Sequence, residues 1–179
     1  EILKIGKTKR EIKNILNNKE IVIDNIIRKD FNFPVGIFDT LSIPSLNKYY
    51  KILYNKKGKL TLNEITKEES EHKTCKIIGK TILKKKKVQL NLSDSKNILV
   101  DKDVYKGRDS VIIKNNKITK HLKFAKDSLI FLTGGRHIGT KGTLVEVKKF
   151  PGISKDIIIY KSDDKNYETL ADYAYVIEK

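Results

Sequence analysis

The sequence of 179 residues is poor in the residues from which proteins build disulfides and metal clusters. It contains one cysteine, Cys75, three prolines, and no methionine or tryptophan. One cysteine excludes an internal disulfide and a cysteine-rich zinc cluster, so Cys75 is interpreted as a buried strand residue. Because Glu1 stands where a translated chain has methionine, we expect the sequence to be a piece of a longer protein.

Long apolar segments are also missing. No uninterrupted apolar run approaches the roughly 18 residues that a membrane span requires, and no charged and then apolar leader opens the sequence. We therefore expect no membrane partner. A single cysteine also fits a reducing compartment, which predicts a cytoplasmic location.

Acidic residues are scarce relative to basic ones. Asp and Glu number 22 against 38 Lys and Arg, which gives a formal net charge of +16. Such an excess repels itself in a compact chain unless an anionic partner neutralises it. The charge balance therefore predicts a nucleic-acid partner.

Residue patterns for catalysis or metal binding are lacking as well. The three histidines, His72, His121 and His137, lie in separate segments without the spacing of a zinc site. Asp163 and Asp164 lie in a polar link, where turn formation explains them. We expect no enzymatic activity, no catalytic residue, no metal, no cofactor and no small-molecule substrate.

Residues 1–46 are predicted to begin with an amphipathic helix. Thr8 is a possible N-cap, and Ile12, Ile15 and Leu16 repeat at helical spacing on one face. The other face carries three cations, Lys9, Arg10 and Lys13. This face is able to contact several phosphates, whereas an ordinary solvated helix face is the alternative interpretation.

A short hairpin and a closing strand complete this first segment. Asp24-Asn25 lies between two β-branched runs, and this pair tolerates the positive φ of a tight turn. Alternating apolar residues up to Ile43 then indicate a strand. Pro44-Ser45 is interpreted as the boundary of the segment.

Residues 47–126 are predicted to form an all-β domain. Lys57-Gly58 turns the chain between two strand patterns, and a charged helical turn or loop follows at residues 66–74. Further short strands are separated by polar turns such as Asn115-Asn116. Turns about every ten residues are typical of a small barrel or sandwich.

Residues 127–179 contain five short strand patterns with brief polar links, which suits a small SH3-like barrel. Four glycines lie in or beside the first link: Gly134, Gly135, Gly139 and Gly142. We expect them to allow positive φ or the close approach of another backbone. A phosphate-binding P-loop does not fit, because a strand and not a helix follows the glycines.

The glycine-bearing link between two apolar strands resembles the KOW motif, and the basic helix with its hairpin resembles the S-four RNA-binding fold. In their order along the chain, these segments resemble the eukaryotic and archaeal small-ribosomal-subunit protein S-four family from end to end. The most specific pieces are Pro34-x-Gly36 with Asp39, Lys57-Gly58-Lys59, Glu68-Glu69 with Lys73-x-Cys75-Lys76, Lys117-Ile118-Thr119, and Thr133-Gly134-Gly135-x-x-x-Gly139-x-x-Gly142.

The resemblance implies an α+β, predominantly β fold. Its three parts are an N-terminal S-four-like helix and hairpin module, a central all-β domain and a C-terminal KOW SH3-like barrel. It implies a structural constituent of the small subunit, bound to ribosomal RNA and neighbouring ribosomal proteins. Two alternatives stay open: a KOW-type transcription elongation or RNA-processing factor, and an RNA-modifying enzyme with an S-four-like targeting domain.

The candidate RNA-binding residues are basic residues in three parts of the chain. They are Lys9, Arg10, Lys13, Lys19, Arg28, Lys29, Lys84, Lys85, Lys86, Lys87, Arg136, His137 and Lys141. The run of four lysines at a predicted hairpin tip is either a solvated loop or a phosphate clamp. The glycine link permits close approach to RNA, where Arg136 can bridge phosphate oxygens.

Overall fold

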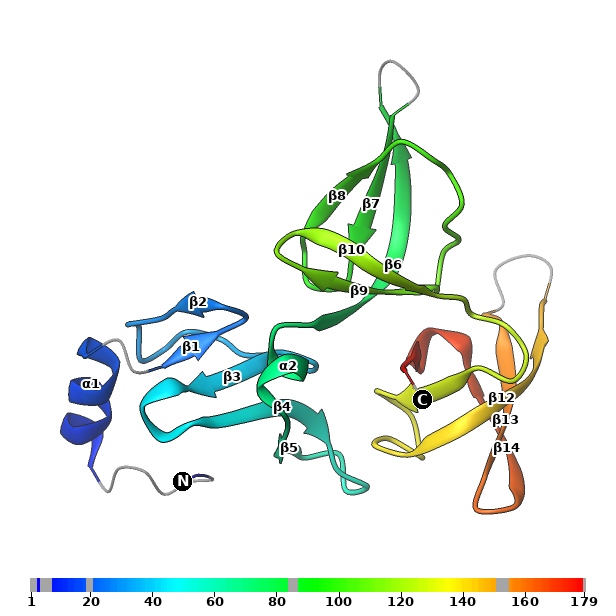
Figure 1. The fold of residues 1–179 in the computed structure, drawn as a ribbon. Coiled ribbons are helices and arrows are strands. Elements are labelled where there is room, and N and C mark those ends of the chain that lie inside the picture. The colour runs from blue at the N-terminus through cyan, green and yellow to red at the C-terminus, as the bar shows by residue number, and fades with distance from the viewer. Residues whose placement is uncertain (1–2, 4–7, 19–20, 84–86, 151–154, 179) are drawn as a thin grey trace. The chain divides into compact units, whose positions relative to one another are not determined.

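The computed structural model describes residues 3, 8–18, 21–83, 87–150 and 155–178. In these ranges the chain is mostly β, with three five-stranded sheets and two α-helices (Figure 1). The chain divides into two compact units: residues 1–54 with 59–73, and residues 55–58 with 74–179. The expected predominantly β fold is confirmed.

The first helix, α1 (Lys9–Asn17), forms where the apolar spacing predicts it. The Thr8 hydroxyl accepts a hydrogen bond from the Glu11 amide at 3.3 Å, which satisfies one of the unpaired amides of the first turn. Leu16 is buried, whereas the basic face of the helix is exposed. The predicted N-cap and the predicted amphipathic helix are both confirmed.

The first unit contains one sheet with the strand order β2-β1-β3-β4-β5. Its strands are β1 (Val22–Ile23), β2 (Ile26–Ile27), β3 (Thr40–Ile43), β4 (Lys48–Tyr54) and β5 (Leu60–Glu64). Asp24 and Asn25 turn the chain between β1 and β2 with φ of 50° and 64°, the left-handed values that the sequence pattern predicts.

The boundary expected after residue 46 falls inside this sheet, between β3 and β4. The 3₁₀ turn η1 (Pro44–Leu46) joins the two strands, and Ile43 pairs with Lys48 directly across it. Pro44 begins this turn, where its fixed φ and missing amide cost nothing, and so it does not end the module. Residues 47–54 therefore belong with α1, as does the short helix α2 (Lys67–Ser70).

The second sheet has the order β10-β9-β6-β7-β8. Its strands are β6 (Lys73–Ile82), β7 (Val88–Leu92), β8 (Asn97–Val100), β9 (Ser110–Lys114) and β10 (Lys117–Leu122). Cys75 is fully buried with Ile77, Leu90 and Val111 in its core, so the interpretation of this cysteine is confirmed. Its buried thiol packs there among apolar side chains.

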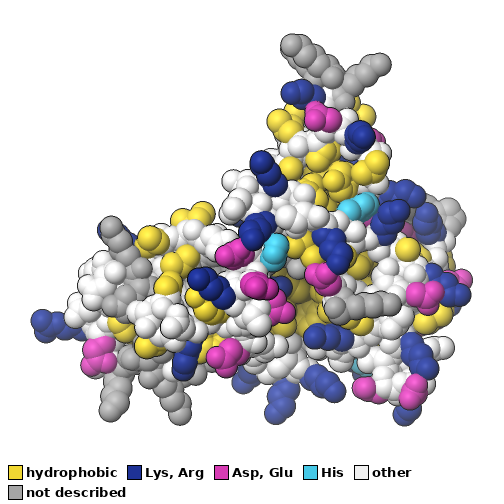
Figure 2. All heavy atoms as spheres, in the orientation of Figure 1, with side chains coloured by type: hydrophobic (Ala, Val, Ile, Leu, Met, Phe, Trp, Pro, Cys, Tyr) yellow, Lys and Arg dark blue, Asp and Glu magenta, His cyan; other side chains and the backbone are white. Residues whose placement is uncertain are grey.

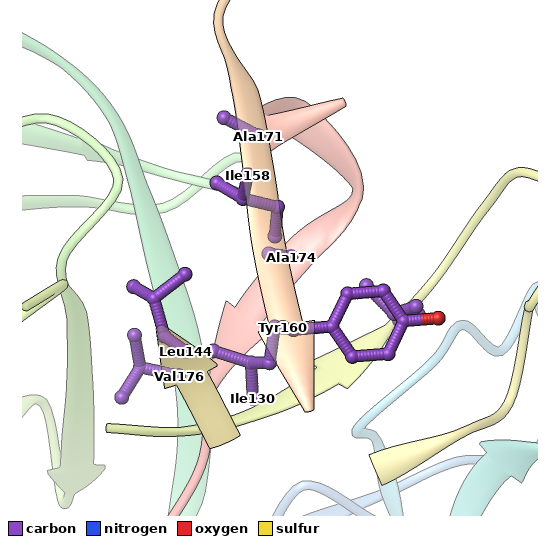
Figure 3. Packing of buried hydrophobic residues seen from close by; sticks show 8 residues of the cluster. Ile130, Leu144, Ile158, Tyr160, Ala171, Ala174 and Val176 are labelled. Atoms are coloured by element: carbon purple, nitrogen blue, oxygen red, sulfur yellow. The ribbon is translucent and has the colours of Figure 1, made fainter. Parts of the chain in front are cut away.

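In the third sheet, the last strand of the chain pairs with the strand that comes first in this segment. Its order is β14-β13-β12-β11-β15. The strands are β11 (Leu129–Leu132), β12 (Lys141–Lys148), β13 (Ile157–Ser162), β14 (Lys165–Leu170) and β15 (Ala174–Val176). Ile130 pairs with Val176, and both pack with Leu144, Ile158 and Tyr160 in one core (Figure 3). All five predicted strands of this segment are present.

Polar side chains join the second and third sheets within the second unit. The ammonium of Lys76, in β6, donates to the backbone carbonyl of Asp172 at 2.7 Å. The Ser110 hydroxyl, in β9, accepts from the backbone amide of Val176 at 3.1 Å. These two bonds connect β6 and β9 of one sheet to the last strand of the other and the turn before it.

Lys76 is an unusual group because its side chain is buried with the charged end inside the protein. It is only 7% exposed, and its ammonium lies 5.2 Å from the centroid of the Tyr175 ring. The pKa of Lys76 is lowered to about 8: burial is the main cause, the negative charge of Asp172 opposes it, and the positive charge of Arg108 adds to it. The folded state therefore disfavours the charged form.

The depressed pKa predicts a pH dependence of stability. The unfolded chain holds the Lys76 proton up to its ordinary pKa of 10.5, whereas the folded chain releases it from about pH 8. Stability must then rise with pH inside this window. We expect the free energy of unfolding of the native protein, relative to Lys76→Met, to increase by about 1 to 2 kcal/mol between about pH 7.5 and 9.5 in urea titrations.

The matched control for this measurement is Lys80→Met, since Lys80 lies on the same strand with its side chain 30% exposed. Its stability profile should run parallel to that of the native protein. If the free energy of unfolding of Lys76→Met also ran parallel to that of the native protein across this pH range, the result would contradict a buried, titrating Lys76.

Candidate nucleic-acid interface

The cations of α1 are placed on the solvent side of the helix. Lys9, Arg10 and Lys13 are all exposed, whereas Leu16 of the same helix is buried. A helix rises 1.5 Å per residue, so these three charges lie within about 6 Å along the axis. In Figure 2 the Lys and Arg side chains project from the visible surface. Such a cluster can neutralise several phosphates at once.

The segment after β2 adds to this helix face. Lys29 is exposed, and the half-buried Arg28 places its guanidinium 4.1 Å from the centroid of the Phe33 ring. The ammonium of Lys9 lies 5.1 Å from the centroid of Phe31, which brings α1 against this segment. We call Lys9, Arg10, Lys13, Arg28 and Lys29 the N-terminal basic surface. Lys19, also a candidate, lies outside the described residues.

Phe31 and Phe33 were missed as members of this surface by sequence reasoning. Their signal is the run Arg28 to Phe33, "RKDFNF", in which two aromatic residues alternate with polar ones directly after two cations. Both rings contact a basic side chain across 4 to 5 Å. The surface is therefore aromatic as well as basic.

The candidate residues of the central region are only partly described. Lys87 is exposed just before β7. Lys84, Lys85 and Lys86 lie outside the described residues, so the phosphate-clamp interpretation of the four-lysine run stays a prediction.

The four glycines of the link serve two different needs. Gly135 and Gly139 have φ of 79° and 77°, a region that side-chain-bearing residues rarely adopt. Gly134 and Gly142 instead make room, because a Cβ on Gly134 would lie 2.6 Å from the Tyr173 ring. A Cβ on Gly142 would lie 2.7 Å from the Lys161 carbonyl oxygen.

The polar side chains of the link differ in their exposure to solvent. Arg136 and Lys141 are exposed. His137 is half-buried, with its ring centroid 4.6 Å from that of Tyr167, and its carbonyl accepts from the Thr140 hydroxyl at 2.7 Å. His137 thus packs against Tyr167 of β14, whereas Arg136 and Lys141 are available to an external anion.

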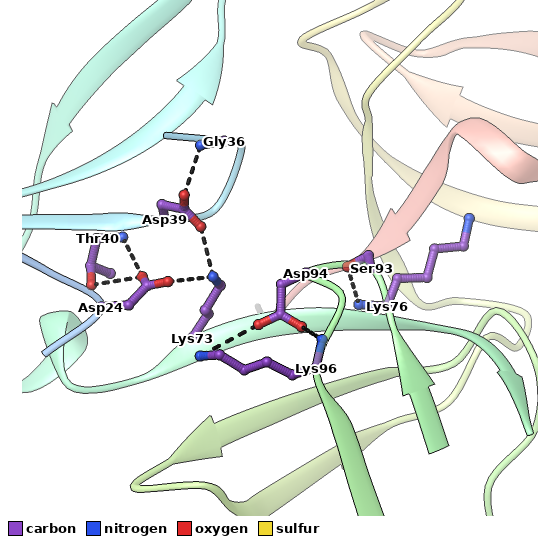
Figure 4. A network of polar contacts seen from close by, with 9 residues as sticks. All are labelled: Asp24, Gly36, Asp39, Thr40, Lys73, Lys76, Ser93, Asp94 and Lys96. Carbon is purple, nitrogen blue, oxygen red and sulfur yellow. Dashed lines mark hydrogen bonds and ion pairs between the residues drawn. The ribbon is translucent and has the colours of Figure 1, made fainter. Parts of the chain in front are cut away.

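Lys73, one of the family-specific residues, holds the N-terminal unit together. Its ammonium forms ion pairs with Asp24 and, at 2.7 Å, with Asp39 (Figure 4). Asp24 also accepts from the Thr40 amide at 3.0 Å, and Asp39 accepts from the Gly36 amide at 2.7 Å. One cation therefore ties the β1–β2 turn and the segment before β3 to the start of β6.

The electrostatics of this cluster favour the charged lysine. Burial alone lowers the pKa of Lys73, but the hydrogen bonds and the charges of Asp24 and Asp39 outweigh burial, so the pKa is raised. The ammonium of Lys73 stays protonated, and the two carboxylates compensate its positive charge within the protein. We do not count Lys73 among the charges available to RNA.

Other family-specific residues are also used internally. Glu69 and Thr66 form a reciprocal capping box at the start of α2. The Thr119 hydroxyl donates to the Ile112 carbonyl at 3.0 Å, and the Thr133 hydroxyl donates to that of Tyr173 at 3.1 Å. These residues specify the fold more than they specify a ligand.

Polar groups that could suggest catalysis have structural partners. His121 Nε2 lies 2.7 Å from Asp109 Oδ2, and Asp109 also accepts from the Phe124 and Lys106 amides. In the described part of the chain, no three His, Cys, Asp or Glu side chains gather as metal ligands. None of the described helices has the length and apolar character to cross a membrane.

Comparison with known proteins decides the family. The model of the ribosomal family S4e matches residues 46–118. Small ribosomal subunit protein eS4 of Methanosphaera stadtmanae is 38% identical over 179 residues, which cover 99% of this chain and 74% of that protein. The chain belongs to the ribosomal family S4e. The eS4 protein of Archaeoglobus fulgidus is 36% identical over 181 residues, covering 100% of this chain and 76% of the other.

A solved structure of the S4e family has the same fold. The crystal structure of the 30S ribosomal protein S4e from Thermoplasma acidophilum matches with a TM-score of 0.83 and 25% identity. The match covers 98% of this chain and 88% of the other. The resemblance drawn from the sequence is thus confirmed, and the elongation-factor alternative is not favoured.

The crowding at Gly142 predicts a large effect of one added methyl group. Gly142→Ala places a Cβ against the backbone of β13 and 2.7 Å from Tyr160 Cδ2, so the paired strands must separate. We expect a loss of about 1 to 3 kcal/mol in the free energy of unfolding. Denaturant unfolding of the folded variant measures this loss.

Gly107→Ala is the matched control, because a Cβ there meets nothing within 4 Å. Its free energy of unfolding should stay within about 0.5 kcal/mol of the native value. Equal stability of the two variants would show that the fold tolerates a side chain at position 142, so that the close approach of β13 does not require glycine there.

Proposed function

We propose that this chain is a structural constituent of the small ribosomal subunit and binds small-subunit ribosomal RNA. The observation that carries the proposal is the match, over nearly the whole chain, to proteins named small ribosomal subunit protein eS4. The formal charge of +16 supports it, since folded RNA supplies the anionic partner that this charge requires. The proposal contains no catalytic step.

The N-terminal basic surface is the main proposed RNA contact. Its exposed cations lie on α1 and beside the β1–β2 hairpin, in the arrangement that resembles the S-four RNA-binding fold. Contacts of this kind go to phosphates and to the shape of folded RNA, because the deep groove of an RNA helix does not admit side chains. The chain would therefore stabilise a folded RNA region during subunit assembly.

The second unit contributes further proposed contacts. Its third sheet is proposed to be a KOW-type SH3-like barrel, with Arg136 and Lys141 beside the glycine link facing RNA. Lys87 supports a contact at the β6–β7 hairpin. Neighbouring ribosomal proteins are the other proposed partners, and the ribosome of the cytoplasm is the proposed location.

Removal of the charges on α1 tests this surface. Lys9→Ala, Arg10→Ala and Lys13→Ala, combined in one variant, should weaken binding to a transcript of the small-subunit ribosomal RNA. The slope of log K against log salt should flatten by roughly 0.7 to 0.9 for each phosphate that the variant no longer neutralises. Filter binding across a series of KCl concentrations measures both quantities.

The control keeps the charge and changes the side chains: Lys9→Arg, Arg10→Lys and Lys13→Arg. This variant should retain the slope of the native protein, because the number of neutralised phosphates is the same. An unchanged slope in the triple alanine variant, with its circular dichroism spectrum intact, would remove α1 from the interface.

A further inference from the structure

Residues 30–33 form a turn that presents an aromatic ring to solvent. The Asp30 carboxylate accepts from the Asn32 amide at 2.9 Å, and the Asp30 carbonyl accepts from the Phe33 amide at 3.3 Å. These two bonds define the turn, and Phe31 at its corner is 40% exposed. Part of the Phe31 ring is therefore open to solvent, where its apolar surface gains nothing from burial.

The surroundings of Phe31 are cationic. The Lys9 ammonium lies 5.1 Å from the ring centroid, and Arg28 and Lys29 precede Phe31 by three and two residues. The neighbouring Phe33 already has the Arg28 guanidinium 4.1 Å from its centroid. Lys9 and Arg28 hold the two rings through cation–π contacts, and the rest of the Phe31 ring stays open to a ligand.

An exposed ring among cations suits an unpaired nucleotide. A base stacks on an aromatic face, while nearby ammonium and guanidinium groups neutralise the flanking phosphates. A regular RNA duplex does not offer this combination, because its bases are stacked on one another. An apolar protein partner fits less well, since docking would bury Lys9 and Arg28 with the ring at a desolvation cost.

We propose that Phe31 is a stacking site for an unpaired base of the ribosomal RNA, with Lys9 and Arg28 positioned to contact the phosphates beside that base. This inference rests on the proposed function and assigns to the N-terminal basic surface a preference for loops and bulges over continuous helices. The ring supplies stacking, and the cations supply the salt-dependent part of binding.

Replacement of the ring by an aliphatic side chain tests the proposal. Phe31→Leu keeps an apolar group at the turn but removes the aromatic face. Affinity for the small-subunit ribosomal RNA transcript should fall by roughly 5- to 150-fold, because base stacking on one aromatic residue contributes about 1 to 3 kcal/mol. The slope of log K against log salt should not change, since the variant neutralises the same phosphates as the native protein.

Two further variants make the result specific to the ring. Phe31→Trp should bind at least as tightly as the native protein. The RNA transcript should quench its tryptophan fluorescence by stacking, and the signal reports on position 31 alone because the chain has no other tryptophan. Val35→Ala removes an apolar side chain of similar exposure, 37%, from the same segment and should bind like the native protein.

Native affinity in Phe31→Leu, or no quenching in Phe31→Trp, would overturn the stacking site. If Phe31→Leu binds RNA normally but fails to enter small subunits, the ring contacts a protein and the proposal is wrong. Failure of the proposed function looks different, because the native protein itself would then not bind the small-subunit ribosomal RNA transcript with a salt-dependent affinity.

Discussion

The arrangement of the N-terminal unit depends on one lysine between two aspartates. Lys73 reaches back to Asp24 in the β1–β2 turn and to Asp39 before β3, and all three side chains are about 13 to 15% exposed. Because these carboxylates also accept backbone amides, the cluster fixes both ends of the segment that carries Arg28 and Phe31. Without Lys73, two poorly hydrated carboxylates would repel each other. The proposed RNA surface is therefore placed by an interaction that takes no part in RNA binding.

The positive charge of the chain has two separate uses. Lys73 and Lys76 are buried against oxygen atoms and hold elements that are distant in the sequence. Lys9, Arg10 and Lys13 have solvent around them instead. The family-specific motifs supply mostly residues with internal contacts, such as Lys73 and Lys76. They therefore identify the fold but do not show where RNA binds. The proposed RNA-facing residues belong to an amphipathic helix, a pattern that many proteins share.

Local features of the fold could be predicted from the sequence, and distant contacts could not. Short-range chemistry determines the Asp24-Asn25 turn and the register that pairs Tyr54 with Leu60, so both follow from nearby residues. The partners of Lys73 lie 34 and 49 residues away, and no periodicity links them. The boundary after residue 46 was misplaced because Pro44 starts a turn within a sheet, which its identity alone does not distinguish from the end of a module.

The central claim is that this chain resides in the small ribosomal subunit. Sedimentation of a cell lysate through sucrose gradients, at moderate salt and then at about 0.5 M KCl, tests it most directly, because peripheral phosphate contacts weaken steeply with salt. We predict that the protein stays with the small subunit in equimolar amount to the other subunit proteins under both conditions. Migration near the top of the gradient, or with RNA polymerase, would contradict the account.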